Sequence, residues 1–260
     1  MDRTLAAQAL FASIAERGSD AVGYAYRERA AGVVVHKQRT GASELLEAVA
    51  IPGGATEALL HVRDYTKGHP SLAANNHPIR HGAVVGIHNG IIANDETIFD
   101  SHGFRHAEPG MTVDSEAIFA LVDETDDPVA ALEELYGSMA TAWLDEREPD
   151  VVFLARGVGR PLWVGEGESE VLFASTLDAL ELAETFARLA LHKREVPDGC
   201  FVKLQAGRIV AAERFEPDRT FTEEPLPSVR NPAERASCLE RLSLLAKRRY
   251  GAIGVSTAAR

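Results

Sequence analysis

The segment Ala83-Val84-Val85-Gly86-Ile87-His88 is an apolar run that leads directly into Asn89-Gly90. An apolar run of this length with a turn signal at its end predicts a buried β-strand. Asn and Gly tolerate positive φ values, so the pair predicts a tight turn where the strand closes. We therefore expect functional groups of a site at Asn89 and Gly90.

A second apolar strand is predicted upstream at Ala58–Arg63, and a long polar loop follows it at 64–82. The loop contains three His, two adjacent Asn and two Pro residues. Loops that a rigid scaffold holds in place often carry binding groups. The end of this strand and its loop are therefore a second place to look for a site.

Helices and strands arrive in clusters, without the strict alternation that is typical of a doubly wound parallel sheet. An α+β fold of packed antiparallel sheets covered by helices fits this order better. Thr4 is the predicted cap of the first helix. Helices are predicted at 4–17, 41–49, 95–102, 113–125, 128–135, 177–189 and from 231 onward, and further strands at 22–26, 33–36, 139–144, 151–155, 162–164, 171–173, 200–204 and 209–212.

We predict one globular domain over residues 1–215, because a chain of 260 residues is long enough to bury a substantial core. A Pro-rich stretch at 216–230 is the predicted linker. Residues 231–260 are expected to form a C-terminal helix and tail, with Asn231 as the cap and Pro232 at the first helical position.

The formal net charge of -12 disfavours nucleic acid and anionic membrane surfaces as partners. Hydrophobic residues make up 45% of the chain and charged residues 25%, which is typical of a soluble globular protein. The residues after Met1 lack a signal-peptide pattern, and no run of about 18 apolar residues occurs. We therefore expect a cytoplasmic protein.

Cys200 and Cys238 are the only cysteines, and neither has metal-ligand spacing around it. We expect both to be buried thiols in a reducing compartment. Histidines at 61, 69, 77, 81 and 88 could suggest a metal site, but none of them forms a His-x-x-x-His helix pair. We therefore expect neither a metal nor a cofactor.

Four segments, taken together and in this order, resemble the class II glutamine amidotransferases, whose glutaminase domain is typified by that of glucosamine-6-phosphate synthase. The resemblance implies the N-terminal nucleophile hydrolase fold, a four-layer αββα sandwich. A later match over 155–175 extends it into the second half. The four segments are residues 17–23 (RGSDAVG), residues 61–78 with His61-Val62-Arg63, Thr66-Lys67-Gly68 and Asn76-His77-Pro78, residues 88–94 (HNGIIAN) and residues 112–116 (TVDSE).

Hydrolysis of an amide requires a nucleophile, a base and donors aimed at the developing oxyanion. The resemblance assigns the oxyanion donors to Asn89 and Gly90. It implies that Arg63 binds the α-carboxylate of glutamine, that Asp114 binds its α-ammonium group, and that Thr66 also contacts the substrate. Arg63 and Asp114 also have ordinary structural interpretations, Arg63 as a surface ion-pair partner and Asp114 as a helix cap.

The family's chemistry depends on a cysteine at the mature N-terminus, at the head of a central strand, and the sequence from Met1 contains neither. Residues 1–260 are therefore expected to be inactive as numbered. Three interpretations stay open. In the first, the natural start of the protein lies upstream of Met1. In the second, Tyr250–Val255 replaces the strand, unless Gly251 simply ends the last helix. In the third, the strand is lost and a binding module that a partner completes remains.

Two smaller departures from the family pattern are Asp64, where the family usually has an aromatic residue, and Lys67, where it often has histidine. An Asp beside Arg63 could compete with a ligand carboxylate unless Lys67 neutralises it. The leading hypothesis is a glutamine amidotransferase domain that hydrolyses glutamine and supplies ammonia to an unknown acceptor, carried by a separate acceptor-domain subunit. The alternative is a non-catalytic protein that binds an amino acid or a partner chain through the same pocket.

Overall fold

The computed structural model describes residues 1–28, 32–223, 227 and 229–251. Its helices and strands form two three-stranded sheets and one six-stranded sheet, in which every strand pair is antiparallel. The helices are α1 (Arg3–Ile14), α2 (Ala42–Leu45), α3 (Asp95–His102), α4 (Glu116–Glu124), α5 (Pro128–Glu133), α6 (Leu177–Ala187) and α7 (Pro232–Tyr250), with 3-10 turns η1 (Ala15–Arg17) and η2 (Ala73–Asn75). The strands are β1 (Ala21–Glu28), β2 (Gly32–Gln38), β3 (Ala58–Arg63), β4 (Ile79–His81), β5 (Val84–Ile92), β6 (Gly137–Asp145), β7 (Val151–Arg156), β8 (Trp163–Glu166), β9 (Val171–Ala174), β10 (His192–Glu195), β11 (Cys200–Gln205) and β12 (Arg208–Arg214).

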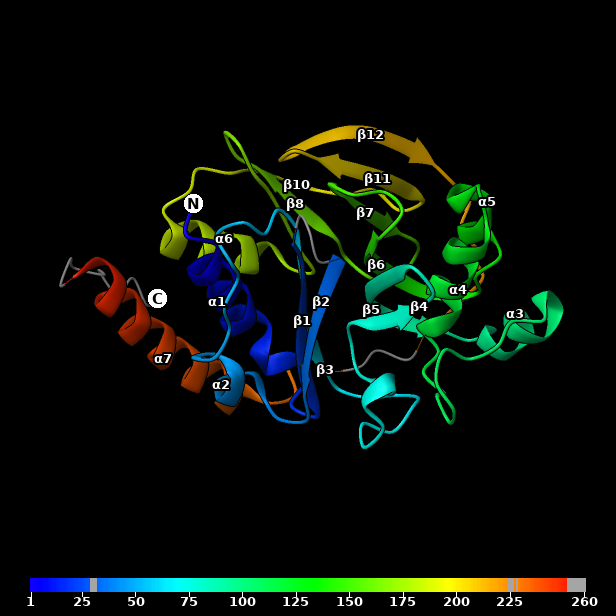
Figure 1. The fold of residues 1–260 in the computed structure, drawn as a ribbon, viewed down its shortest axis with the longest axis horizontal. Coiled ribbons are helices and arrows are strands. Elements are labelled where there is room, and N and C mark those ends of the chain that lie inside the picture. The colour runs from blue at the N-terminus through cyan, green and yellow to red at the C-terminus, as the bar shows by residue number, and fades with distance from the viewer. Residues whose placement is uncertain (29–31, 224–226, 228, 252–260) are drawn as a thin grey trace.

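The elements are arranged in layers, which Figure 1 shows from the side. Helices α1, α6 and α7 cover the two small sheets, β2-β1-β3 and β10-β8-β9. The large sheet, β12-β11-β7-β6-β5-β4, lies on the other side of the small sheets in this view, and α4 and α5 cover the face of the large sheet that points away from them. Three separate buried clusters fill the spaces between these layers. The α+β class predicted from the order of elements is therefore confirmed.

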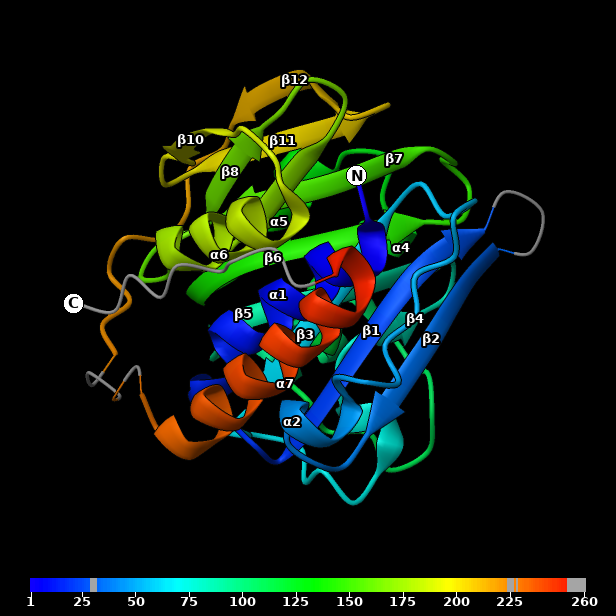
Figure 2. The ribbon, with the colours of Figure 1, turned by 90° about the vertical axis from the view of Figure 1, so that its left-hand side faces the viewer.

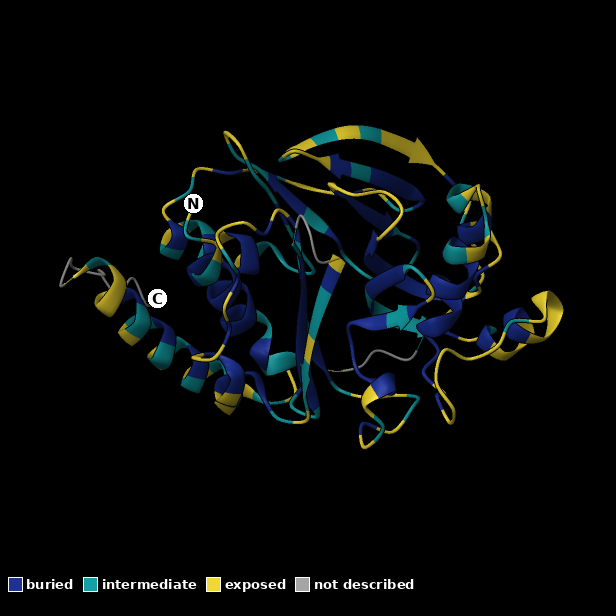
Figure 3. Cartoon of the chain, viewed as in Figure 1, coloured by how far each residue is buried: buried dark blue, intermediate teal, exposed yellow. Residues whose placement is uncertain are grey.

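Strand β6 shows why the layers hold together, because all nine of its residues are buried. Trp143 packs in the cluster under α4, whereas its neighbours Ala142 and Leu144 pack in the cluster between the sheets. Successive side chains of a strand point to opposite faces, so one strand contributes to two cores. Figure 3 shows this contrast between the buried centre of the molecule and the exposed outer strand β12.

Two predictions about the helix ends were wrong in detail. Asp2, and not Thr4, caps α1, because the Asp2 carboxylate accepts the Leu5 N–H at 3.1 Å. Thr4 instead exchanges hydrogen bonds with the backbone of Ile51. Asn231 precedes α7 as predicted, but its side chain donates to Ser19 Oγ and caps no helical N–H.

Helix α7 packs across α1, as Figure 2 shows, and its buried face joins the same cluster as α1 and α6. Tyr250 is its last residue, and the guanidinium of Arg188 lies 4.0 Å above the Tyr250 ring. Gly251 follows with a φ of 73°. The interpretation in which Tyr250 begins a central strand is therefore wrong, and Gly251 ends the helix. Residues 252–255 lie outside the described part of the chain.

The division into residues 1–215, 216–230 and 231–260 stays a prediction, and the proposed linker and tail lie partly outside the described residues. Among the described helices, none is both long enough and apolar enough to cross a membrane.

The packing of α7 predicts unequal effects for two leucines on the same helix. Leu242 is fully buried, whereas Leu244 is 48% exposed. We expect Leu242→Ala to lower the free energy of unfolding by about 2–5 kcal/mol, because it leaves a cavity among α1, α6 and α7. Leu244→Ala is the matched control, with an expected change within about 0.5 kcal/mol. Urea unfolding checks both, and equal effects would show that α7 is not part of this core.

Candidate functional site

Strand β5 runs through Asn89 and Gly90 and does not end there. Asn89 pairs with Ala140 and Gly90 with Met139 on β6. The predicted tight turn is therefore wrong, although Gly90 does adopt a φ of 147°. A Cβ at Gly90 would lie 1.9 Å from the carbonyl oxygen of Ser138, so glycine is required by the close approach of β6.

The side chain of Asn89 lines a cavity, and its Nδ2 atom is buried without a hydrogen-bond partner among the described residues. Buried side-chain donors in native proteins are normally bonded, so an orphan donor requires an explanation. The amide N–H groups of Asn89 are therefore free to bind an acceptor that enters the cavity.

Arg63 is the last residue of β3, and its buried guanidinium organises the loop that follows. It donates to Asn76 Oδ1 at 2.7 Å, to the Lys67 carbonyl at 2.7 Å and to the Gly68 carbonyl at 2.6 Å. Burial lowers the pKa of Arg63 to about 10, while the nearby carboxylates of Asp114 and Asp20 act to raise it. Arg63 therefore stays charged at neutral pH, and its hydrogen bonds in the described residues all go to neutral acceptors.

Asp114 is buried, and one of its carboxylate oxygens accepts the backbone N–H of Ile92 at 2.8 Å. Its side chain faces β5 and makes no cap hydrogen bond to α4, which begins after Ser115. The carboxylate attracts the Arg63 guanidinium electrostatically, but the two groups form no direct ion pair. A positive and a negative side chain therefore lie near each other without neutralising each other by contact.

Two further hydrogen bonds fasten the neighbouring segments to β5 beside Asn89. His61 Nε2 lies 2.9 Å from the carbonyl oxygen of His88, and His88 Nδ1 lies 2.9 Å from Ser115 Oγ. Strand β3 and the segment that leads into α4 thus meet at the same part of β5. The structure thus brings Arg63 near Asp114 and fastens Asp114 to Ile92 of β5, the strand that carries Asn89 and Gly90. Asn89 lines the cavity, whereas Arg63 and Asp114 do not.

Thr66 is exposed in the loop after β3. Lys67 does not pair with Asp64. Asp64 forms an ion pair with Arg230, while Lys67 pairs with Asp95 and Glu96 across the loop.

Sequence reasoning missed a group of three histidine rings at the site, of which His77 and His88 are buried and His61 is half-buried. The rings of His61 and His77 lie 4.1 Å apart, and neither nitrogen of His77 has a partner among the described residues. Burial lowers the pKa of His61 to about 3, and burial also lowers the pKa values of His77 and His88. All three are therefore neutral at pH 7. Within the described residues no cluster of His, Cys, Asp and Glu is suited to a metal ion.

Arg17 is a second residue whose place the sequence did not reveal. It lies in η1 and lines the cavity, where its guanidinium donates to Ser175 Oγ at 3.3 Å. Burial lowers its pKa, and the charges of Arg160 and Arg230 add to this effect. The only signal in the sequence was its position in the segment that resembles the amidotransferases.

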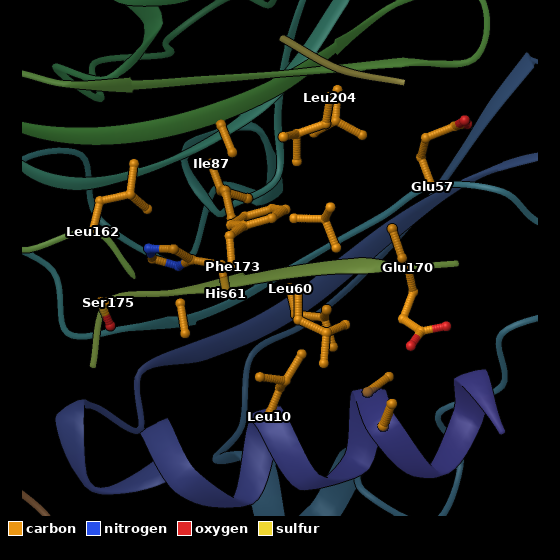
Figure 4. A pocket seen from close by; sticks show the side chains of 18 of the residues that line it. Leu10, Glu57, Leu60, His61, Ile87, Leu162, Glu170, Phe173, Ser175 and Leu204 are labelled. Atoms are coloured by element: carbon orange, nitrogen blue, oxygen red, sulfur yellow. The ribbon is translucent and has the colours of Figure 1, made fainter. Parts of the chain in front are cut away.

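The cavity has a volume of about 580 Å³ and lies between α1, the small sheets and the large sheet. Figure 4 shows Leu10, Leu60, Ile87 and Phe173 around it. His61 and Ser175 lie at one end, and Glu57 and Glu170 at the other.

Neither cysteine lines this cavity. Cys200 is buried in β11 and Cys238 in α7, as predicted. Burial raises the pKa of Cys200, and it raises that of Cys238 to about 12, so both thiols stay protonated at neutral pH. A nucleophilic cysteine needs the opposite shift.

The hydrogen bonds of Arg63 predict that Arg63→Lys loosens the loop at 64–76. Lysine cannot reproduce the fork that reaches Asn76 and two carbonyls at once. We expect amide hydrogen exchange in this loop to accelerate by about tenfold or more, which corresponds to about 1.4 kcal/mol of lost local stability. Arg194→Lys, at an exposed pair with Glu166, is the control. Unchanged exchange in both variants would contradict the role of Arg63.

The buried His77 predicts a pH-dependent stability difference. Its pKa is below 6.5 in the folded protein, so the unfolded chain binds the extra proton as pH falls below about 6.5 and the wild type loses stability. In His77→Phe this loss is absent. The free energy of unfolding of the variant minus that of the wild type should therefore rise by about 1.4 kcal/mol for each pH unit of acidification below pH 6.5. The same difference should stay constant between pH 7.5 and 8.5. Chemical unfolding at these pH values tests this, and a difference that is flat throughout would refute it.

Residues 61–182 match the glutamine amidotransferase domain family. The isomerizing glutamine–fructose-6-phosphate aminotransferase of Salmonella typhi is 33% identical over 176 residues, which cover 63% of this chain and 28% of the relative. The enzyme of that name from Caulobacter vibrioides is 36% identical over 229 residues, or 82% of this chain and 36% of the relative. This chain thus spans about a third of the length of these relatives.

Two solved structures share the fold. The glutamine phosphoribosylpyrophosphate amidotransferase from B. subtilis superposes with a TM-score of 0.62 at 19% identity and covers 80% of this chain and 46% of its own. A structure described as the allosteric regulatory enzyme of purine biosynthesis gives a TM-score of 0.65 at 19% identity, covering 82% and 46%. The resemblance drawn from the sequence is thereby confirmed: the chain contains a class II glutamine amidotransferase domain of the N-terminal nucleophile type, similar to that of glutamine–fructose-6-phosphate aminotransferase.

Proposed function

We propose that the site around Arg63, Asp114 and Asn89 binds glutamine and that, in its complete form, it hydrolyses the side-chain amide to glutamate and ammonia. Two observations support this proposal: the Nδ2 atom of Asn89 on β5 is buried and unpartnered, and Asp114, which is bonded to Ile92 of the same strand, lies near the cation Arg63 without pairing with it directly. A free amino acid with a polar amide carries the three complementary groups.

In this proposal each residue has a separate role. Arg63 keeps N–H groups that the loop does not use, and a guanidinium is well suited to the α-carboxylate. The second oxygen of Asp114 accepts the α-ammonium group. The exposed Thr66 is proposed to contact the substrate from the loop.

Asn89 Nδ2 and the backbone N–H of Gly90 are proposed as the oxyanion donors. Water replaces the amide nitrogen at the carbonyl carbon, and negative charge develops on the carbonyl oxygen during the attack. Donors that are fixed in a site from which water is excluded stabilise this charge without having to reorganise. The neutral state of His61, His77 and His88 keeps competing charge away from the reaction.

The nucleophile is not one of the two described thiols, because both are buried outside the cavity and protonated. We therefore propose that residues 1–260 as numbered bind glutamine without turning it over. In the complete enzyme the ammonia would pass to an acceptor domain or subunit, and a cytoplasmic setting fits the reduced thiols. No cofactor or metal is required for amide hydrolysis of this kind.

The protonation of both thiols also favours the alternative, a non-catalytic amidotransferase-like protein that binds an amino acid or a partner chain through this site. The two proposals share the ligand chemistry of Arg63 and Asp114. They differ only in whether bound glutamine is cleaved.

Calorimetric titration with L-glutamine, with an ammonia-release assay on the same samples, tests the proposal. We expect saturable binding that Asp114→Asn weakens by about tenfold or more, since the ammonium group loses its charged partner, worth about 1.5–3 kcal/mol. Asp150→Asn, at an exposed residue that also lines the cavity, is the matched control. Under both proposals residues 1–260 bind glutamine without releasing ammonia. Ammonia release by a longer form of the chain supports the enzyme, and binding without release by that longer form supports the non-catalytic protein. A chain that stays folded but binds no glutamine contradicts both.

A further inference from the structure

Asn75 is a buried residue at the end of η2, and its side chain bonds to two different segments of the chain. Its Nδ2 atom donates to the carbonyl of His69 at 3.1 Å, within the loop at 64–76 that Arg63 organises. Its Oδ1 atom accepts the backbone N–H of Thr112 at 2.9 Å. Thr112 belongs to the segment that carries Asp114 and leads into α4. One side chain therefore joins the loop to the Asp114 segment.

The neighbouring Asn76 is also buried, but its side chain bonds only inside the loop and to Arg63. Its Oδ1 atom accepts from the Arg63 guanidinium at 2.7 Å, and its Nδ2 atom donates to the carbonyl of Pro70 at 2.9 Å. The two asparagines therefore have different tasks. Asn76 holds the guanidinium within the loop, whereas Asn75 holds the loop against the Asp114 segment.

The loop and the Asp114 segment also touch at Gly68. A Cβ at Gly68 would lie 2.9 Å from the backbone nitrogen of Val113 and 3.0 Å from Cγ of Asn75. The φ of Gly68 is 78°, which is a further reason for glycine at this position. The close contact leaves no room for the loop to move nearer to the segment, and the bond from Asn75 opposes movement away from it.

We propose that Asn75 is a positioning residue that fixes the separation of Arg63 and Asp114 and thereby makes the site selective for α-amino acids. This inference rests on the proposed function, in which Arg63 binds the α-carboxylate and Asp114 binds the α-ammonium group. Both groups are attached to one carbon atom of the ligand, so their two partners have to be held at one separation. Binding groups are effective only when they are held within about 0.5 Å of the required geometry.

A second route connects the two sides of the site through β5. Asp114 accepts from the backbone of Ile92, and His61 bonds to a carbonyl of β5. This route holds the Asp114 carboxylate and β3, but the Arg63 guanidinium is held by carbonyls of the loop. Loss of the Asn75 side chain should therefore leave both partners in place and loosen the distance between them.

The test compares L-glutamine with L-β-homoglutamine, in which one more methylene group separates the ammonium group from the carboxylate. We expect calorimetric titration to show that the wild type prefers glutamine by at least about tenfold, and that Asn75→Ala reduces this preference to about threefold or less. A looser pair of partners accommodates both spacings. If Asn75 only stabilised the fold, its loss would weaken both ligands by the same factor and leave the preference unchanged.

Asn94→Ala is the matched control, because the side chain of Asn94 also joins two segments of backbone. It donates to the carbonyl of Glu134 at 2.9 Å and accepts the backbone N–H of Tyr136 at 2.8 Å. Neither bond involves the loop at 64–76 or the Asp114 segment. This variant should keep the wild-type preference for glutamine.

A second measurement uses the wild type alone. Glutamine that bridges Arg63 and Asp114 holds the loop against the segment, so it opposes the opening in which the Thr112 N–H leaves Asn75. Saturating glutamine should therefore slow amide exchange at Thr112 by at least about fivefold, and saturating β-homoglutamine should slow it less.

Four results would overturn the proposal while leaving the proposed function standing. They are equal wild-type binding of the two ligands, an unchanged preference in Asn75→Ala, an equal loss of preference in Asn94→Ala, and exchange at Thr112 that saturating glutamine does not alter. A folded wild type that binds no glutamine would instead overturn the proposed function, and this inference with it.

Discussion

The site depends on how the buried guanidinium of Arg63 is satisfied. A charged group in the protein interior is costly unless hydrogen bonds and opposite charges surround it. Two carbonyls and Asn76 supply the hydrogen bonds, so the loop after β3 must fold back over the strand end. Asp114 supplies an opposite charge at a distance, held in place by Ile92 of β5. Loop, strand and helix start are therefore positioned by one buried charge.

Gly90 shows where sequence reasoning gave a wrong structural reason for a residue. The pair Asn89-Gly90 was identified as functional because it predicted a turn, yet β5 continues through it. The glycine is needed because the carbonyl of Ser138, on a strand almost 50 residues away, leaves no room for a Cβ. A contact of this kind depends on tertiary pairing, which single-sequence patterns do not contain.

Other elements also divide into those that a local sequence pattern predicts and those that depend on tertiary pairing. The bounds of β3 and α3 agree with prediction, because each has a strong apolar or capping pattern of its own. Strands β4 and β10 were missed, since they are short and polar and are strands only because β5 and β8 pair with them. At the site, the resemblance to a family singled out Arg63, Asn89 and Asp114 as candidate residues. The contacts of the histidine rings and of Arg17 could not be predicted, because their partners come from other segments of the chain.

The central claim is that Arg63, Asp114 and Asn89 form one amino-acid site. A crystal structure of the chain with bound L-glutamine tests it most directly. The account predicts the α-carboxylate within hydrogen-bonding distance of Arg63, the α-ammonium group at Asp114 and the amide oxygen toward Asn89 Nδ2. Glutamine bound elsewhere, or bound here with its carboxylate turned away from Arg63, would contradict the account.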